Sequence, residues 1–241
     1  MAIELSIVQQ RGTIFIPSFI NYSEENAAKY ADLLPGAKPV PTPVPTPFGG
    51  PNMMPEELQQ GSSWQFVRGN TRIAFLPNRV DVFKDWISPR HQNEENDFLS
   101  LCKTVLGIVI DREKVKASRV AYSPALARDK DATFSEDMLW DVLLTKTTLG
   151  DVKPMEVSIN RNYRVKRMLA GHEMMFNFRA SFGSANHTLP DGTVATGSVL
   201  VNFDINSIPE ENYQFDTSLL SAFFDSALGY SDELYNNFMG E

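Results

Sequence analysis

A short basic segment in an acidic chain is the part of this sequence best suited to chemistry or binding. It gathers charged and aromatic side chains within 12 residues, at Arg161, Tyr163, Arg164, Lys166, Arg167 and His172. Guanidinium groups bind phosphate and carboxylate through paired hydrogen bonds, and a neighbouring ring offers a surface for stacking. The pattern therefore predicts a binding site for an anionic partner, on a segment that we expect to form a loop over residues 161–173.

The charge distribution supplies a second interpretation of the same segment. The chain has a net charge of −8, and residues 181–241 carry nine acidic residues and no lysine or arginine. Such acids can neutralise a basic loop within the fold, or they can present an oppositely charged face to a partner. The negative total also disfavours nucleic acid as the partner, because affinity for phosphate backbones comes largely from lysine and arginine.

Motifs of common catalytic and cofactor sites are missing from the sequence. It contains no G-x-x-x-x-G-K-[ST] or G-x-G-x-x-G phosphate loop and no G-x-S-x-G nucleophile turn. One cysteine and three scattered histidines do not make a structural zinc site. Cys102 falls on the apolar stripe of a predicted helix, so we expect a buried, unreactive thiol. We therefore predict no catalytic residue, no metal and no cofactor.

These observations favour a non-enzymatic protein that binds a protein or an anionic ligand. An enzyme with an unrecognised site is the first alternative. Its candidate groups are Arg119, Tyr122 and Glu173, with His172 beside them, in a cleft between two halves of the chain. A structural subunit of a larger assembly is the second alternative, and self-association is compatible with all three.

The first part of the chain must position these groups through strands and two helices. The expected elements are a strand over Arg11–Ile16, a helix capped by Ser23, strands over Trp64–Val67, Arg72–Leu76 and Arg79–Phe83, and a helix over 94–110. Residues 35–55 hold eight prolines within a Pro-rich insert over 35–60. Alternating prolines cannot enter a helix or a central strand, so we expect an extended surface segment, either a recognition motif or only a loop.

The second part of the chain repeats this order of elements. We expect a strand over Lys116–Tyr122 that ends at Ser123-Pro124, a helix capped by Ser135, strands over Met155–Asn160, Met174–Phe182 and Val194–Ile205, and a last helix capped by Asp216. The sequence thus predicts an α+β fold of two tandem β-α-β-β-β-α units, over residues 1–110 and 111–241. Their sheets are expected to be mainly antiparallel with helices on one face, joined edge to edge or packed face to face around a cleft.

The compartment follows from what the sequence lacks. No stretch approaches the roughly 18 apolar residues of a membrane span, and the first residues do not resemble a signal peptide. A single cysteine fits a reducing environment. We therefore expect a cytoplasmic protein without a membrane partner.

Several segments resemble a family of sporadically distributed bacterial proteins of unknown function. The similar segments are the hairpin Arg72–Phe83 followed by Trp86 and the 94–110 helix, the strand Ala117–Pro124, and Val201–Asn206 with the closing helix. The resemblance implies an α+β fold and a bacterial or phage context, associated with mobile elements or defence. It implies no catalytic residue, although Arg119 and Tyr122 match the family's strand motif.

Overall fold

The computed structural model describes residues 5–42, 63–89, 92–128, 158–188 and 192–239. Its strands are β1 (Ser6–Phe15), β2 (Lys38–Thr42), β3 (Ser63–Arg68), β4 (Thr71–Leu76), β5 (Arg79–Pro89), β6 (Arg119–Arg128), β7 (Ser158–Leu169), β8 (His172–Thr188) and β9 (Val194–Ser207). Its helices are α1 (Glu24–Tyr30), α3 (Gln92–Glu113) and α6 (Thr217–Met239), with 3-10 turns η1 (Ala31–Leu33) and η2 (Pro209–Glu211). The mixed helix and strand content confirms the predicted α+β class.

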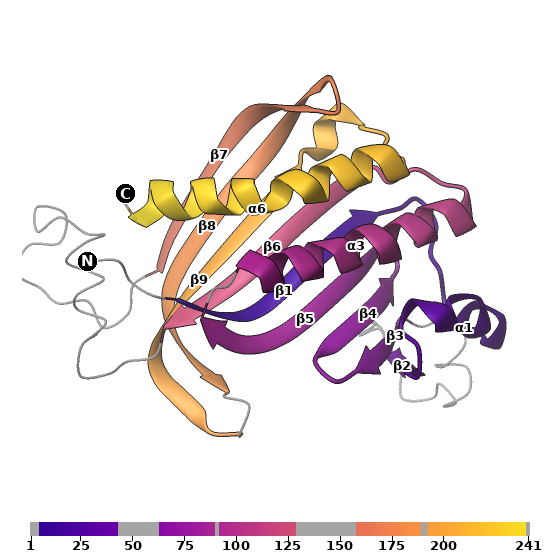
Figure 1. Cartoon of the computed structure of the whole chain (residues 1–241), viewed down its shortest axis with the longest axis horizontal. Coiled ribbons are helices and arrows are strands. Elements are labelled where there is room, and N and C mark those ends of the chain that lie inside the picture. The colour runs from indigo at the N-terminus through magenta and orange to yellow at the C-terminus, as the bar shows by residue number, and fades with distance from the viewer. Residues whose placement is uncertain (1–4, 43–62, 90–91, 129–157, 189–191, 240–241) are drawn as a thin grey trace, which may run out of the picture.

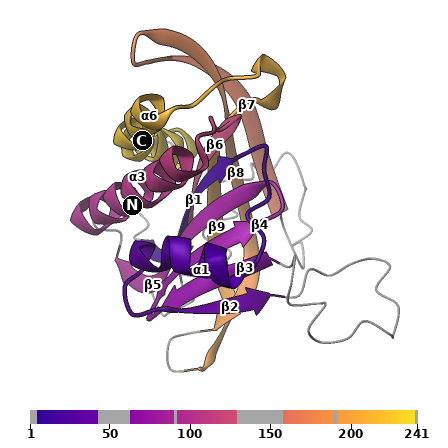
Figure 2. The ribbon, with the colours of Figure 1, turned by 90° about the vertical axis from the view of Figure 1, so that its right-hand side faces the viewer.

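All nine strands belong to one antiparallel sheet, in the order β2-β3-β4-β5-β1-β6-β9-β8-β7. The sheet is therefore broader than either predicted set of strands. Helices α3 and α6 lie side by side across one face, and α1 lies at the β3 end of the same face (Figures 1 and 2). No helix in the described part of the chain is long and apolar enough to cross a membrane.

The two long helices run antiparallel to each other on the sheet. Thr217 at the start of α6 donates a hydrogen bond of 2.8 Å to Asp111 near the end of α3. Half-way along both helices, Lys103 and Asp225 form an ion pair at 2.6 Å. Asp216 caps α6 as predicted, because its carboxylate accepts from the backbone N–H of Leu219 at 2.9 Å.

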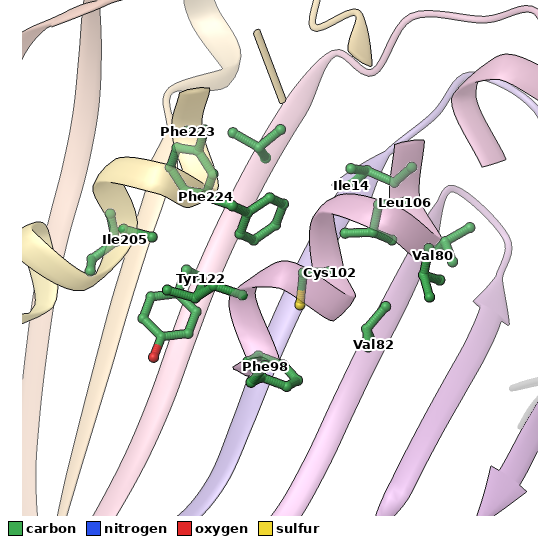
Figure 3. Packing of buried hydrophobic residues seen from close by; sticks show 14 of the residues in the cluster. Ile14, Val80, Val82, Phe98, Cys102, Leu106, Tyr122, Ile205, Phe223 and Phe224 are labelled. Carbon is green, nitrogen blue, oxygen red and sulfur yellow. The ribbon is translucent and has the colours of Figure 1, made fainter. Parts of the chain in front are cut away.

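The core lies between these helices and the sheet. Figure 3 shows Phe98, Cys102 and Leu106 of α3 and Phe223 and Phe224 of α6 beside the strand residues Ile14, Val80, Val82, Tyr122 and Ile205. All ten side chains are buried. Because strand side chains alternate between faces, the intervening positions, such as Arg11, Ser123 and Asp204, belong to the opposite face. We call that opposite face the polar face.

The α3 helix approaches the central strand β1 closely because residue 12 is glycine. A Cβ at this position would lie 2.5 Å from the sulfur of Cys102 and 3.2 Å from the ring of Phe224. Real Cβ atoms are not found that close to another heavy atom. The missing side chain of Gly12 is therefore what admits Cys102 and Phe224 to the sheet.

Cys102 is expected to be chemically silent in the native protein. It is fully buried, and burial raises the pKa of its thiol well above the ordinary value, so almost no thiolate forms near neutral pH. A thiol-reactive chromogenic disulfide should label less than a tenth of the protein at pH 8 in one hour, and one thiol per chain in strong denaturant. Rapid native labelling would contradict the burial of Cys102.

One predicted strand boundary is wrong in an informative way. The strand expected to end at Ser123-Pro124 continues as β6 to Arg128. On one side, Pro124 faces Gln10 of β1, near a bulge between Ile7 and Gln9. On the other side, the β6–β9 register passes from Tyr122 directly to Ala125. Proline has no N–H to donate to a neighbouring strand. The interruption of the β6–β9 pairing contains Pro124, the residue that lacks this donor.

The Pro-rich insert and the predicted helix near Ser135 have different outcomes. Residues Lys38–Thr42 are extended, as predicted, and form the edge strand β2 against β3. Proline is tolerated at a sheet edge and helps to keep other strands from adding there. The rest of the insert after Thr42 and the helix expected from Ser135 lie outside the described residues.

Candidate anion-binding pocket

The basic segment over 161–173 is not a loop. It forms most of β7 and the start of β8, joined by a two-residue turn. Ala170 and Gly171 have φ values of 48° and 84°, the left-handed conformation that such tight hairpin turns require. The charged side chains therefore alternate between the two faces of an edge strand, so they do not form one cluster.

Three of the predicted site residues lie on the helix side of β7. Arg167 forms an ion pair with Glu233 of α6 at 2.5 Å, and Arg161 donates to the backbone oxygen of Asn237 at 3.2 Å. The ring of Tyr163 lies 5.7 Å from that of Phe178. This side of the segment binds the protein's own last helix.

The polar-face side of β7 also has internal partners. Arg164 pairs with Glu210 at 2.9 Å, and Lys166 pairs with Glu173 at 2.7 Å. The bond to Glu173 raises the pKa of the Lys166 amine. Glu210, like Glu233, belongs to the acidic segment 181–241. The intramolecular pairing that the sequence offered as an alternative is thus present, while a role for the segment in partner binding stays a prediction.

The predicted cleft residues are not brought together. Tyr122 is buried on the helix side, where its hydroxyl accepts from the Gln10 amide at 2.5 Å. Arg119 lies on the polar face and donates to Asn206 at 3.0 Å. Glu173 and His172 lie at the β7–β8 turn, beside a cavity of about 500 Å³ next to the start of α6. Strand alternation separates Arg119 from Tyr122, and neither of them lines the cavity beside the turn.

A different group of residues surrounds a pocket of about 350 Å³ on the polar face. Four neighbouring strands, β1, β6, β9 and β8, supply its side chains. They are Gln9, Arg11, Ser123, Pro124, Ala125, Arg179, Ser181, Asn202, Phe203 and Asp204. The small side chain of Ala125 leaves room between Gln9 of β1 and Asn202 of β9, its partners in the two ladders. Such a volume suits a small molecule.

Hydrogen bonds fix the floor of this pocket. Arg11 donates to Ser123 at 3.3 Å, and the Ser123 hydroxyl donates to Asp204 at 2.9 Å. The amide of Asn206 donates to the other oxygen of Asp204 at 3.0 Å. The polar groups are thus held by packed strands and by one another before any ligand arrives.

Arg11 and Arg179 differ from Arg164 and Arg167 in forming no ion pair within the described residues. Within the described residues, neither guanidinium forms an ion pair; the single hydrogen bond of Arg179 is a long one of 3.4 Å to Asn160. The Nε of Arg11 is buried without a hydrogen-bond partner. By contrast, Arg164 and Arg167 each hold a carboxylate. The pocket therefore has two cationic groups with unused donors.

Sequence reasoning missed both arginines. The strand around Arg179 alternates apolar Phe176, Phe178 and Ala180 with polar Asn177 and Arg179. This alternation could have placed Arg179 on the face away from the core. Its proximity to Arg11 depends on the pairing of β1 with β6, which no local pattern predicts.

Comparison with known proteins adds no functional information. No protein-family model matches the chain, and no curated protein sequence matches it. The described residues contain no group of three or more histidine, cysteine or acidic side chains arranged to hold a metal ion.

The arrangement of the pocket is suited to binding an oxyanion between two guanidinium groups, with hydroxyl and amide donors beside them.

Proposed function

We propose that this is a non-enzymatic binding protein that holds an anionic ligand in the pocket on its polar face. The observation that carries the proposal is the pair of arginines, Arg11 and Arg179, that line the pocket and form no ion pair among the described residues. In a chain of net charge −8, two unpaired guanidinium groups at one pocket are well suited to attract a negative ligand.

The buried Nε of Arg11, which has no hydrogen-bond partner, is a further argument for an anionic ligand. A buried N–H without a partner costs free energy, about 1–3 kcal/mol by comparison with mutational data. A phosphate or carboxylate oxygen next to Arg11 Nε would remove that cost and form a charge-assisted hydrogen bond. The binding free energy would thus come in part from a donor that the free protein leaves unused.

We also propose that the sheet is built from two units of the β-α-β-β-β-α order, residues 1–110 and 111–241, joined at β1 and β6, with β2 as an additional edge strand of the first unit. The order of strands supports this arrangement: β5, β4 and β3 follow outward from β1, and β9, β8 and β7 follow outward from β6. Each series ends in a long helix, α3 or α6. The pocket would then lie across the joint, with Arg11 from one unit and Arg179 from the other.

The bacterial or phage setting and a cytoplasmic location belong to this proposal as well. They rest on the resemblance and on the single cysteine. A macromolecular partner that carries the anionic group is compatible with the pocket, because Arg11 and Arg179 require only the anion itself.

Two charge-matched double variants test the proposed site. Arg11→Gln with Arg179→Gln removes both pocket cations, and Arg164→Gln with Lys166→Gln removes two cations of β7 on the same face. Inorganic phosphate and succinate serve as probes. Their binding is measured by calorimetric titration and by the shift in thermal unfolding. Wild-type protein and the β7 variant should bind, and the pocket variant should bind at least about a hundredfold more weakly, since each charged hydrogen bond contributes about 1.5–3 kcal/mol.

The outcome separates the two candidate sites. Equal loss in both variants would indicate a general charge effect and would contradict the pocket. Loss confined to the β7 variant would favour the segment at Arg161–His172 instead. Absence of binding of both probes to wild-type protein at tens of millimolar would reject a simple anion as the ligand of this pocket.

A further inference from the structure

A carboxylate lies between the two arginines of the pocket. Asp204 of β9 is the cross-strand partner of Arg179 on β8, and it accepts the Ser123 hydroxyl that Arg11 also contacts. Despite this position, Asp204 forms no ion pair with either arginine among the described residues. A site that served only a simple anion would be weakened by this negative charge, because a like charge near the ligand repels it.

Asp204 has acceptor capacity left for a ligand. An ionised carboxylate offers about four lone-pair positions, and Ser123 and Asn206 supply one hydrogen bond to each of its oxygens. These two neutral donors orient the group but leave its charge without a cation. A ligand that carries a positive donor next to its own anionic group would complement Asp204 and both arginines at once.

The other side chains of the pocket indicate a small and strongly polar ligand. Gln9, Asn202 and Ser181 add amide and hydroxyl groups. The aromatic residue at the pocket, Phe203, is buried in the core on the helix side, so its ring gives no stacking surface. Bases of nucleotides are usually held by such stacking, which makes a nucleotide a poor fit.

We infer, on the basis of the proposed anion site, that the ligand is a small zwitterion of the α-amino-acid class. Its carboxylate binds between Arg11 and Arg179, and its ammonium group donates to Asp204. The amides of Gln9 and Asn202 and the hydroxyl of Ser181 then contact the ligand's remaining polar atoms. The two charged groups of the ligand thereby meet both signs of charge in the pocket.

A matched pair of ligands tests this inference on the wild-type protein. L-aspartate and succinate share a four-carbon dicarboxylate skeleton and differ in the ammonium group. We expect L-aspartate to bind at least about tenfold more tightly than succinate in calorimetric titration, as one charge-assisted hydrogen bond predicts. N-acetyl-L-aspartate, which has lost the ammonium charge, should bind as weakly as succinate or more weakly.

A protein variant completes the comparison. Asp204→Asn should abolish the preference for L-aspartate over succinate, with thermal unfolding used to verify that the variant is folded. Equal or weaker binding of L-aspartate by the wild-type protein would overturn the zwitterion, even if Asp204→Asn does not fold. If L-aspartate shows no preference but succinate binds the wild-type protein and not the Arg11→Gln with Arg179→Gln variant, the proposed anion site is still supported. No binding of L-aspartate, succinate or phosphate would reject both.

Discussion

Gly12→Ala is expected to destabilise the protein by about 3 kcal/mol, at the upper end of what overpacking a core costs. The added methyl group would lie 2.5 Å from the sulfur of Cys102, in a strand that is paired on both sides. Neither β1 nor α3 can move away easily, because β1 is a central strand of the sheet and α3 is also bound to α6. The free energy of unfolding, measured by urea denaturation, checks the prediction.

Removing the clashing atom provides the decisive control. Cys102→Ala should itself cost stability, but in that background Gly12→Ala should cost less, with a coupling of at least about 1 kcal/mol. Gly229→Ala on α6 is the matched glycine control. Nothing lies within 4 Å of its added Cβ, so this change should stabilise the helix by up to about 1 kcal/mol. Additive effects of Gly12→Ala and Cys102→Ala would contradict the contact.

The elements that pack against the core could be predicted from the sequence. The stripe of Phe98, Cys102 and Leu106 at helical spacing identified α3, and alternation in Val199, Val201 and Phe203 identified β9. In both cases the apolar period of the sequence reports which side chains are removed from water. The cap residues Ser23 and Asp216 were predicted for an equally local reason, since each binds a backbone N–H three residues later.

Strand β7 was predicted only as far as Asn160, and its continuation to Leu169 was missed because its inward positions are not all apolar. Arg161 and Arg167 occupy core-side positions that a period of two would assign to hydrophobic residues. They are tolerated there because α6 supplies a carboxylate from Glu233 and the backbone oxygen of Asn237. Those partners lie more than 60 residues away in sequence, so the segment has the local composition of a loop.

The pocket could not be predicted for a related reason. Its arginines lie 168 positions apart, and each looks like an ordinary solvent-facing residue of its own strand. They share a site because β1 pairs with β6, and β9 lies between β6 and β8. Periodicity assigns a side chain to a face, but only the order of strands decides which side chains on that face are neighbours.

Arg79→Gln is the second substitution with a large expected effect, because it removes the cation beside a buried carboxylate. Asp81 of β5 is fully buried on the polar face, where it accepts from the Thr13 hydroxyl at 2.7 Å. Arg79 Nε lies 3.1 Å from its other oxygen, close enough for an ion pair although not aligned as a hydrogen bond. We expect a loss of roughly 2 kcal/mol at pH 7, below the usual cost of breaking a fully buried pair, because Arg79 is partly exposed.

The loss should depend on pH in a defined direction. Burial raises the pKa of Asp81 above its ordinary value of 3.8, while Thr13, Arg79 and Arg11 act to lower it. The folded protein therefore holds the Asp81 proton at pH values where the unfolded chain has released it, and this group's contribution to stability falls as pH rises through that window. Without Arg79 the folded pKa rises further, so the window extends to higher pH.

Unfolding free energies of wild-type protein and Arg79→Gln, measured between pH 4 and pH 8, should therefore converge as the pH is lowered. Arg164→Gln is the matched control, because its pair with Glu210 is more than half exposed on both sides and should contribute no more than about 0.5 kcal/mol. In an Asp81→Asn background the pH dependence of the Arg79→Gln effect should disappear. A loss that stays constant with pH, or that persists unchanged in that background, would show that Arg79 stabilises the fold by packing, without acting on the charge of Asp81.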